Sequence, residues 1–547
     1  MKKIRDFLND KKDILIIGIF IIFIIMLPYM NSETLVVGAD YEYHFTRIDS
    51  IKEGLKEKIF PVKVHPKMCN NYGYGTGFFY PNFFLYIPAF LCLIGVDFVI
   101  SYKLFILLML IVMIVISYIS FKDVLEDKKS ALIALIIYTL SNYITLQLYQ
   151  RCALGEFLAA VFVPAAVAGI YNYTHKSFDK PWLIAIGFWG LINSHLISTF
   201  LCAIYVMVIF IFNFKKSLKN VKLFIKIVSI AILVAMMTAA YWGPMFEQMA
   251  IADFNYEKPW TTADKNDFGI YELFSKDENY YGIAITIALP IMIFGLFNKN
   301  GTKKSKLFVI EFLILTYIMS SQLFWNVTKP IMGIVQFKWR FLGIATTIAS
   351  IAIAMILKEQ CYKKEKNSKI ITGLVLVVSI FSFFYHNTDL IIFNKEQVKN
   401  SLYSLWFSIG GGTEYLPLGF NVADTGIQGC ILTENFEKIP YEKVYNRFEF
   451  SVSDKEQKRL YVPLLYYYGY VADIIDEQGV VSPLKVIESE KHLVEIDTEG
   501  KTGKIRVWYN GTKIQKVSYL VTIIGYGLVL TIIILKVIKR RIKNRDN

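Results

Sequence analysis

Charged residues are scarce in this chain. Only 19% of its 547 residues are Asp, Glu, Lys or Arg, whereas 55% are hydrophobic and the mean hydropathy is +0.43. A soluble protein could not bury that much apolar surface in its core. The low charge content therefore excludes a soluble globular protein and indicates an integral membrane protein with many spans.

Cysteine and histidine are also rare, with six residues of each. The cysteines are scattered without paired spacing, which argues against a disulfide framework and against a zinc site. The histidines form no ligand cluster of plausible spacing either. We therefore predict no cofactor and no metal site from these residue types.

Long apolar runs take up most of the chain. Runs of roughly 17–25 apolar residues are long enough to cross a hydrocarbon layer of about 30 Å as a helix. They predict an all-α polytopic membrane protein with about 12 transmembrane helices and an inserted extracytoplasmic β-rich domain. The predicted spans are 14–30, 98–121, 131–149, 158–173, 181–194, 197–213, 223–242, 282–297, 307–324, 341–357, 370–386 and 517–536.

Basic residues gather in short segments between these runs. Seven segments hold 29 of the 59 Lys and Arg residues, and twelve spans would place all seven on one side, as the positive-inside rule requires of cytoplasmic loops. We attribute the net charge of +14 to topology and not to a nucleic-acid partner. The termini are predicted to be cytoplasmic, and 31–97 and 387–516 extracytoplasmic. The basic segments are 1–13, 122–129, 174–180, 214–222, 298–306, 358–369 and 536–547.

Three stretches near the N-terminus carry separate predictions, and the first two of them are predicted to be helical. The first apolar run is followed by no small-residue cleavage site, so we expect a retained helix and not a removed signal peptide. The stretch "DYEYHFTRIDSIKEGLKEK", 40–58, has apolar residues at helical spacing and predicts a helix. The stretch "YPNFFLYIPAFLCLIG", 80–95, is short and broken by proline, which predicts an interfacial or re-entrant element.

The segment 387–516 changes from helical to alternating periodicity. "HLVEIDTEGKTGKIRVWYNGT", 492–512, predicts a β-hairpin, and "RLYVPLLYYYGYVADII", 459–475, predicts strands. We therefore expect three parts. They are a transmembrane domain over 1–386 with its first outer loop at 31–97, a β-rich extracytoplasmic domain over 387–516, and a last transmembrane helix with a basic tail over 517–547.

Polar residues gather directly after the first span, in "GADYEYHFTRID", 38–49. Asp40, His44 and Arg47 stand at i, i+4 and i+7 and share one helical face, whereas Glu42 points elsewhere. A carboxylate there could be a general base, and the imidazole could orient it or bind a phosphate. An ordinary surface helix explains the spacing equally well. The position, facing outward after a span, favours a functional role for Asp40.

Other polar residues are expected at the outer helix ends. Two cations on the outer rim, Lys338 and Arg340, suit a lipid-linked phosphate. Ordinary structural roles would explain the other residues as well: Arg151 as an interfacial arginine, Glu156 as a glutamate at a helix start and His195 as a packing histidine. A last candidate, Glu414 in "GGGTEYLP", is either a turn residue or a binding residue. The rim candidates are Arg151 and Glu156 in "YQRCALGEFLAA", His195 in "LINSHLIST", and Gln336, Lys338 and Arg340 in "VQFKWRFLG".

The architecture and motifs together resemble the GT-C class of membrane glycosyltransferases. In their order they resemble the branch labelled "6-pyruvoyl-tetrahydropterin synthase-related" membrane proteins, akin to the YfhO-like family. No histidine set supports a pterin-synthase activity. Besides the motifs above, "GYGTGFFYPNFFLYIPAFL", "INSHLIS", "EYLPLG", "YVPLLYYYGYVA" and "YNGTKIQKVSYLVTIIG" carry the resemblance, which extends from Gly38 to Gly525.

The resemblance implies a sugar transferase that uses a polyprenyl-phosphate-linked donor at the outer membrane face and an envelope polymer or glycolipid as acceptor. Asp40 would be the base, His44 would orient it or contact the phosphate, and the departing phosphate would be held by Lys338, Arg340 and Arg151. The sequence reads Asp-Tyr-Glu at 40–42 and not Asp-x-Asp, which leaves a divalent metal unsupported.

Two alternatives to a transferase stay open. A transporter or flippase for a lipid-linked saccharide would favour ionisable residues near the membrane midplane and broken helices in repeated halves. A non-catalytic membrane protein would use its β domain to bind glycans, with Asp40 only structural. The transferase hypothesis makes a geometric prediction. Six residues should converge on one outward cavity: Asp40, His44, Arg151, Glu156, His195 and Arg340.

Overall fold

The computed structural model describes residues 2–30, 34–255, 269–274, 280–299, 301–361, 365–393, 397–399, 413–422 and 430–545. The chain divides into two compact units, each assembled from segments that are distant in sequence. The first unit comprises 1–44, 96–230 and 259–402. The second comprises 45–95, 231–258 and 403–547.

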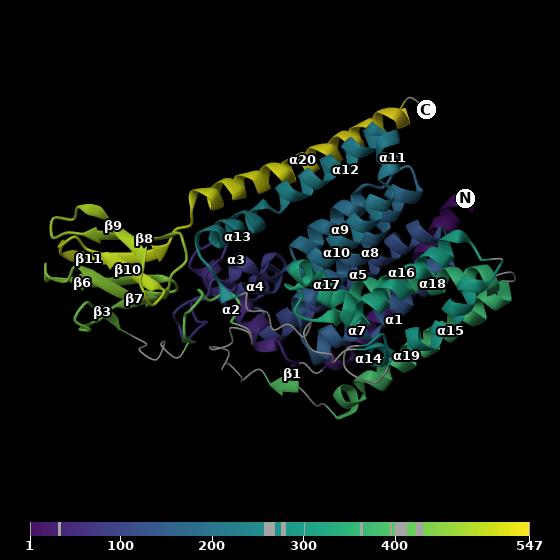
Figure 1. The fold of residues 1–547 in the computed structure, drawn as a ribbon, viewed down its shortest axis with the longest axis horizontal. Helices are drawn as coiled ribbons and strands as arrows, with labels where there is room; N and C mark the ends of the chain where they lie inside the picture. Colours follow the sequence, from purple (N-terminus) through teal and green to yellow (C-terminus); the bar gives the residue numbers. More distant parts are fainter. Residues whose placement is uncertain are drawn as a thin grey trace. The chain divides into compact units, whose positions relative to one another are not determined.

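The first unit is a bundle of helices (Figure 1). The helix α2 (Tyr41–Lys56) begins in this unit and ends in the second, and so does α12 (Val221–Met237). A short antiparallel pair joins β1 (Thr34–Val36) to β2 (Gln397–Lys399). The remaining elements are α1 (Lys2–Met26), η1 (Leu27–Tyr29), α5 (Phe98–Leu125), α6 (Lys128–Thr139), α7 (Asn142–Thr145), η3 (Leu146–Gln150), α8 (Leu154–His175), α9 (Trp182–Ile192), α10 (Leu196–Phe212), α11 (Phe214–Lys219), α14 (Ile270–Phe274), α15 (Ile283–Phe297), α16 (Lys303–Ser320), α17 (Gln322–Met332), η6 (Lys338–Phe341), α18 (Leu342–Cys361) and α19 (Glu365–Phe393).

Helix α8 lies at the centre of this bundle and packs against α5, α9, α10 and α18. Its apolar window is entirely buried, as expected for a helix that is hydrophobic all round. Small residues let α9 approach closely: a Cβ on Gly187 would lie 2.5 Å from the backbone nitrogen of Ala166, and one on Gly169 would lie 2.5 Å from Ile184. Close approach through small residues is typical of membrane helices, where dispersion contacts drive packing.

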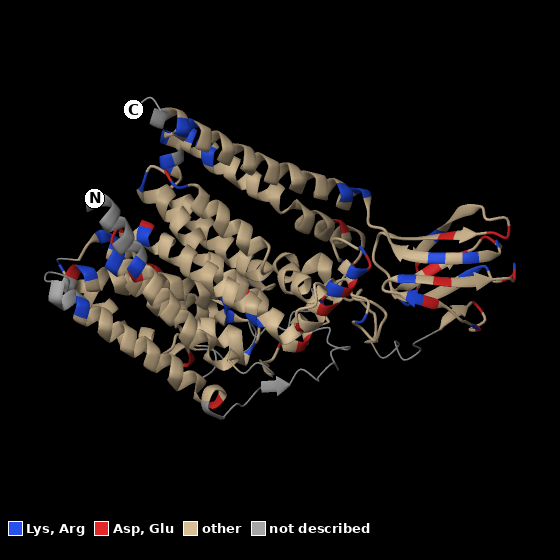
Figure 2. Ribbon diagram, turned by 180° about the vertical axis from the view of Figure 1, so that it is seen from behind, with Lys and Arg blue, Asp and Glu red and all other residues tan. Residues whose placement is uncertain are grey.

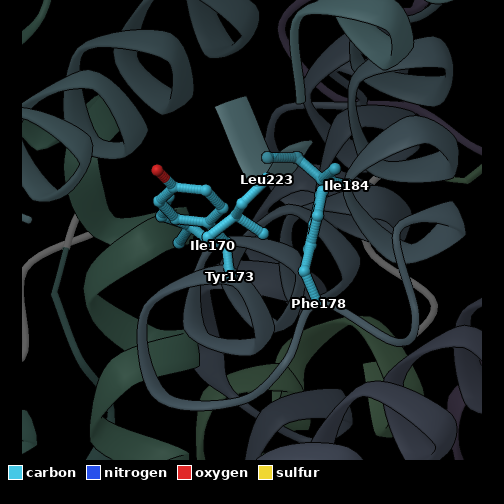
Figure 3. Close-up of a cluster of buried hydrophobic side chains, with 5 residues drawn as sticks. All are labelled: Ile170, Tyr173, Phe178, Ile184 and Leu223. Atoms are coloured by element: carbon cyan, nitrogen blue, oxygen red, sulfur yellow. The ribbon is translucent and has the colours of Figure 1, made fainter. Parts of the chain in front are cut away.

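A cluster of buried apolar side chains packs around the C-terminal part of α8 (Figure 3). Ile170 and Tyr173 come from α8, Ile184 from α9, Leu223 from α12, and Phe178 from the connection between α8 and α9. The rings of Tyr173 and Phe178 meet edge to face at 5.5 Å. The cluster fixes the turn that joins the two helices.

The basic segments of the first unit gather at one end of its bundle (Figure 2). Lys128 pairs with Asp13 at 2.8 Å, and Lys180 pairs with Asp123 at 2.5 Å. The ammonium group of Lys358 donates to the carbonyl of Leu125, and that of Lys216 to the carbonyl of Lys176. These contacts place the described residues of five predicted basic segments on one side, as the charge pattern predicts: 1–13, 122–129, 174–180, 214–222 and 358–369. Which side of the membrane this is stays a prediction.

The helices identify a multi-pass membrane protein, but the predicted number of twelve spans is not confirmed. Among the described residues, six helices are long and apolar enough to cross a membrane, or up to nine if each bent pair of helices is one span. Predicted spans 181–194, 197–213 and 282–297 fall on α9, α10 and α15, which have 11, 17 and 15 residues. α9 and α15 are shorter than the roughly 17 residues that a span needs, and α10 lies at that lower limit.

The second unit combines short helices, one long apolar helix and a curled antiparallel sheet. The sheet has nine strands in the order β4-β3-β7-β10-β9-β8-β11-β6-β5. The helices are α3 (Thr76–Phe79), η2 (Phe83–Leu85), α4 (Tyr86–Leu93), α13 (Ala239–Ile251) and α20 (Lys513–Arg545). The strands are β3 (Ile431–Thr433), β4 (Lys438–Ile439), β5 (Glu442–Val444), β6 (Arg447–Val452), β7 (Arg459–Leu465), β8 (Tyr470–Ile475), β9 (Val481–Glu488), β10 (Leu493–Asp497) and β11 (Gly503–Tyr509).

The predicted strands are present, but the predicted hairpin over 492–512 is wrong. The two alternating runs form β10 and β11, which do not pair with each other. β10 pairs with β7 and β9, so both of its edges are occupied, and β11 pairs with β6 and β8. An alternating pattern of apolar and polar residues indicates a half-buried strand, but it does not indicate which strand pairs with it.

The helix predicted over 40–58 agrees with the structure, whereas the place of 80–95 at the outer interface stays a prediction. The stretch 40–58 forms α2, which ends at Lys56. The stretch 80–95 forms η2 and α4, a short apolar helix over Phe83–Leu93. Such a helix is too short to cross the hydrocarbon layer. The boundaries 1–386, 387–516 and 517–547 stay a prediction, since the compact units are assembled from other segments.

Candidate functional site

A backbone ladder in the first unit brings the start of α2 against the segment before α8. The amide of Ala39 donates to the carbonyl of Gln150 at 3.1 Å, and that of Asp40 donates to the carbonyl of Arg151 at 2.7 Å. Only glycine fits beside this ladder, because a Cβ on Gly38 would lie 2.3 Å from the carbonyl oxygen of Gln150. The ladder thus fixes Asp40 next to Arg151.

The segment before α8 reaches this position through an irregular turn. Residues Leu146–Gln150 form a π-helical turn, η3, which is closed by a hydrogen bond from the Arg151 amide to the Leu146 carbonyl at 2.9 Å. Cys152 follows in the left-handed region, with φ of 48°. Side chains tie the turn to the end of the first helix, since the hydroxyl of Tyr29 donates to the carbonyl of Leu148 at 3.1 Å. Such π-helical turns are frequent at functional sites.

Asp40 and Arg151 form an ion pair at the start of α2. The distance between Asp40 Oδ2 and Arg151 Nη2 is 3.7 Å, and the side chains are 43% and 19% exposed. The carbonyl of Asp40 accepts the first helical hydrogen bond, from His44 at 3.2 Å. The positive end of the helix dipole favours the ionised carboxylate at this position. Glu42 is exposed and accepts a hydrogen bond from Tyr41, so it points elsewhere, as predicted.

Two aromatic rings connect Arg151 with Arg340. The Arg151 guanidinium lies 4.4 Å from the ring centre of Trp339 and 5.6 Å from that of Phe337. The Arg340 guanidinium lies 5.1 Å from the ring centre of Phe337. The two rings are themselves stacked at 5.3 Å. Their π faces attract both cations, which offsets the repulsion between like charges.

A buried ion pair completes the cluster. Arg340 Nε lies 3.2 Å from Glu156 Oε1, and these side chains are 7% and 3% exposed. Glu156 stands in the first turn of α8, where the helix dipole favours a negative charge. The ring of Tyr143 lies beside the start of α18, where a Cβ on Gly343 would lie 3.1 Å from it, three residues after Arg340. We call these residues the Asp40–Glu156 cluster: Asp40, Tyr143, Arg151, Glu156, Phe337, Trp339 and Arg340.

Several polar atoms of this cluster are buried without a hydrogen-bond partner among the described residues. They are Arg151 Nε, Glu156 Oε2, Arg340 Nε and Arg340 Nη1. Arg340 Nε lies at ion-pair distance from Glu156 Oε1 but without hydrogen-bond geometry. An unsatisfied buried polar atom costs about 1–3 kcal/mol, and more when it is charged. Such atoms call for a water or a ligand. Three of them are cationic donors, which an anionic oxygen would satisfy.

The other predicted site residues have different surroundings. His195 is the N-cap of α10, and its Nδ1 accepts hydrogen bonds from the Ser198 amide at 3.3 Å and the Ser198 hydroxyl at 2.9 Å. Lys338 is buried and donates to Gln322 at 2.6 Å. His44 is buried one turn into α2, and Gln336 is half-buried before η6. Glu414 belongs to the second unit, and Gly410–412 of its motif lie outside the described residues.

Contacts within the first unit thus join four of the predicted residues, namely Asp40, Arg151, Glu156 and Arg340. For His44 and His195 the convergence stays a prediction. No motif or spacing in the sequence pointed to Tyr143, which packs beside Gly343 at the start of α18. Among the described residues, no group of three or more His, Cys, Asp and Glu could hold a metal ion.

Arg47 shares a helical face with Asp40 by spacing but makes structural contacts within the second unit. Its guanidinium donates to Asn82 at 2.8 Å and to the carbonyl of Pro81 at 2.7 Å, and it lies 4.2 Å from the ring centre of Tyr80. The side chain is almost fully buried. Arg47 therefore fixes the loop that carries Tyr80 and Asn82.

An apolar cavity of about 410 Å³ lies among α8, α10, α16 and α17 of the first unit. Its walls are mostly aliphatic and aromatic, and they include Ile170, Val208, Ile314 and Phe324. The lining also includes Phe341, which directly follows Arg340 of the Asp40–Glu156 cluster. The cavity could therefore hold an apolar chain near that cluster.

Comparison with known proteins shows one family. A profile described as a family of unknown function, DUF6541, matches residues 14–356. An uncharacterised protein of Lactococcus lactis subsp. cremoris (strain MG1363) is 25% identical over 331 residues, which are 55% of this chain and 52% of that protein. The chain thus spans about half the length of the curated relative that it matches.

Solved structures show only distant similarity. The arabinofuranosyltransferase AftD from Mycobacteria is 10% identical, with a TM-score of 0.43 over 71% of this chain and 27% of AftD. The oligosaccharyltransferase of Archaeoglobus fulgidus, in complex with Zn and sulfate, is 14% identical, with a TM-score of 0.38 over 67% of this chain and 53% of that enzyme. Scores of this size do not assign an activity, and the resemblance to the 6-pyruvoyl-tetrahydropterin synthase-related branch stays a prediction. The family match covers more than half of the sequence, and the chain therefore belongs to DUF6541, a family of unknown function.

Proposed function

We propose that this protein is a membrane glycosyltransferase that moves a sugar from a polyprenyl-phosphate-linked donor to a cell-envelope polymer or glycolipid at the outer membrane face. One observation carries the proposal: a partly exposed carboxylate, Asp40, pairs with Arg151 in a cluster that also holds Arg340 and unsatisfied cationic donors. Transfer with inversion needs a base on one side of the sugar and positive charge around the leaving phosphate.

Asp40 is the base in this proposal. Its carboxylate takes the proton of the acceptor hydroxyl while the acceptor oxygen bonds to the anomeric carbon. The bond from that carbon to the phosphate oxygen breaks, and the polyprenyl phosphate leaves with the electron pair. Asp40 suits this step because its side chain is 43% exposed and accessible to an acceptor.

Arg151 and Arg340 are the phosphate-binding residues in this proposal. Arg151 Nε and Arg340 Nη1 have no hydrogen-bond partner among the described residues, and phosphate oxygens would satisfy both. Trp339 and Phe337 hold the two guanidinium groups, and Glu156 positions Arg340. Lys338, Gln336 and His44 are proposed to support this site from neighbouring positions.

The apolar cavity supports the proposal that the sugar donor is linked to a lipid. A polyprenyl chain needs an apolar path, and the cavity is lined mainly by aliphatic and aromatic side chains. Its lining includes Phe341, next to the phosphate-binding Arg340. A chain that occupied the cavity could thus carry its phosphate toward the Asp40–Glu156 cluster.

The test measures donor consumption by the purified full-length protein in detergent, with a radiolabelled polyprenyl-phosphate sugar and envelope glycans. Asp40→Asn should lower turnover about 100-fold or more, the range expected for loss of a general base. Glu42→Gln is the matched control, since Glu42 is exposed and pairs with Tyr41. Equal donor consumption by wild type and Asp40→Asn would refute the role of Asp40.

A flippase for the same lipid-linked saccharide is a second candidate. The helices α6 and α7–η3 bend by 43° at their break, and α16 and α17 bend by 83°. Broken helices are typical of transporters. Transport of the labelled donor into proteoliposomes without any sugar transfer, by both wild type and Asp40→Asn, would favour the flippase.

A further inference from the structure

The second unit contains a polar cavity of about 560 Å³ that the proposed chemistry does not use. Its volume lies within the range of ordinary small-molecule sites. Three kinds of element form its walls: helix α2, the loop 66–72 and the strand β5 with its flanking residues. The residues of all three that line the cavity belong to the second unit.

Helix α2 and Glu57, which directly follows it, contribute a polar wall. Ser50, Glu53 and Glu57 line the cavity and stand at i, i+3 and i+7, which is one face of a helix. Ser50 is 1% exposed, and its Oγ has no hydrogen-bond partner among the described residues. The Glu57 side chain is exposed and forms no ion pair with another described residue. This wall therefore offers hydrogen-bonding groups that a ligand could engage.

The β5 region contributes an aromatic wall. Tyr441, Lys443 and Tyr445 line the cavity at alternate positions, so their side chains point to one side of the strand. The hydroxyl of Tyr445 donates to the carbonyl of Ser50 at 3.0 Å, which fixes this wall against α2. Tyr441 packs on Phe448 with ring centres 4.8 Å apart. Tyrosine rings supply rigid apolar faces with a polar edge.

The loop 66–72 contributes the third wall in an unusual conformation. Cys69, Asn70 and Asn71 are consecutive residues in the left-handed region, with φ of 54°, 53° and 66°. Left-handed conformations cost energy for residues other than glycine and concentrate at ligand-binding positions. The Asn71 carbonyl accepts a hydrogen bond from Lys443 at 2.6 Å, which ties this wall to β5. Tyr72 adds a third tyrosine to the lining.

The charges around the cavity select against ionic ligands. Lys67 pairs with Asp49 at 2.9 Å, and Lys52 pairs with Glu53 at 3.0 Å. Lys443 and Glu57 complete a balanced set of three basic and three acidic groups. Equal numbers of acidic and basic groups give this cavity no net charge that would attract a phosphate. Among the described residues, no acidic or histidine group suits a metal ion here.

Aromatic faces beside many hydrogen-bonding groups suit one class of ligand, a sugar. A pyranose ring has an apolar C–H face that stacks on a tyrosine and a rim of hydroxyl groups that each donate and accept. We propose that this cavity is a binding site for a neutral saccharide of one or two sugar residues. The proposal stands on the cavity alone and does not depend on the transferase activity.

Saturation-transfer difference NMR on the purified full-length protein in detergent tests this site. The probes are maltose, cellobiose, lactose and N,N′-diacetylchitobiose, with glucose 6-phosphate as the charged comparison. We expect saturation of ring protons in at least one neutral disaccharide. Tyr441→Ala and Glu57→Gln should each weaken its affinity about tenfold or more.

Matched controls separate a site effect from a folding defect. Tyr468→Ala and Glu477→Gln change exposed residues that do not line the cavity and should leave the affinity unchanged. Glu57→Gln alters an exposed side chain, so it should fold even if Tyr441→Ala does not. Asp40→Asn should also bind normally, which separates this proposal from the transferase. Failure of all four disaccharides to bind, tighter binding of glucose 6-phosphate, or unchanged affinity in Glu57→Gln would overturn the proposal.

Discussion

The backbone amide of Asp40 donates to the carbonyl of Arg151 at 2.7 Å, so these two residues are neighbours through the main chain as well as through their side chains. This arrangement differs from a simple surface ion pair. The main-chain bond holds the carboxylate and the guanidinium together even when a ligand separates their charges. The position of Asp40 therefore depends on the segment before α8 and not on α2 alone.

Substitution of Gly38 tests this dependence. A Cβ at Gly38 would lie 2.3 Å from the carbonyl oxygen of Gln150, so Gly38→Ala must displace the ladder that holds Asp40. We expect a loss of about 1–3 kcal/mol in the free energy of unfolding, as for other overpacked sites. Gly373→Ala is the control, because a Cβ there meets nothing within 4 Å. Thermal unfolding in detergent measures the stability of both variants. An equal stability of Gly38→Ala and Gly373→Ala would show that the hydrogen bonds of Ala39 and Asp40 to the segment before α8 tolerate a Cβ at Gly38.

Because Glu156 and Arg340 form a buried ion pair, a substitution of one partner alone should strongly lower the free energy of unfolding. Glu156→Leu leaves the Arg340 charge buried without its partner and should cost about 3–5 kcal/mol. The double variant Glu156→Leu/Arg340→Met should be more stable than Glu156→Leu alone, since it removes the unpaired charge. Lys501→Gln breaks an exposed pair with Glu499 and should change stability by less than about 1 kcal/mol. A double variant no more stable than Glu156→Leu would contradict the argument.

The aromatic contact to Arg151 predicts a graded effect on donor binding. Trp339→Leu removes the ring that lies 4.4 Å from the Arg151 guanidinium and should weaken donor affinity by about 0.5–2 kcal/mol. Trp339→Phe should restore most of this loss, because it keeps a π face. Trp182→Leu, at an exposed position, is the control. Binding of labelled donor measures the effect, and failure of phenylalanine to restore affinity would exclude the cation–π contact as its cause.

The buried Lys63 predicts a pH-dependent stability of the second unit. Its ammonium group donates to the carbonyls of Gly77 at 3.3 Å and Ala240 at 3.1 Å, and burial lowers its pKa to about 7. The unfolded lysine has a pKa near 10.4 and binds more protons than the folded one between these values. Stability should therefore rise with pH from about 7 to about 10 and be lowest below pH 7.

Comparison of the unfolding temperature at pH 6.5 and 9.5 checks this prediction. The increase in wild type should be larger than in Lys63→Met, which lacks the titrating group. Lys513→Met, at an exposed position, should keep the full increase. An identical pH response of wild type and Lys63→Met would show that Lys63 does not carry this effect.

The residue types of the cluster were predictable, but their pairing was not. Asp40, Arg151, Glu156 and Arg340 stand out in the sequence because they are ionisable residues at the ends of apolar runs. Spacing along the chain suggested His44 as the partner of Asp40 and a supporting or structural place for Arg47. The structure adds Arg151 as an ion-pair partner of Asp40 and gives Arg47 structural contacts with Asn82 and the carbonyl of Pro81. Helical spacing reports only neighbours within one helix, whereas these partners come from distant segments.

Local patterns in the sequence predict a multi-pass helical membrane protein, the gathering of basic segments on one side and the strands within 459–475 and 492–512. These features follow from local physics: the length of a helix across hydrocarbon, the cost of charge inside it, and the alternation of a half-buried strand. Tertiary contacts set the number and length of the helices, the strands that pair with β10, the acid that neutralises Arg340 and the rings that hold Arg151. Those choices depend on contact energies between segments far apart in the chain, and no local pattern encodes them.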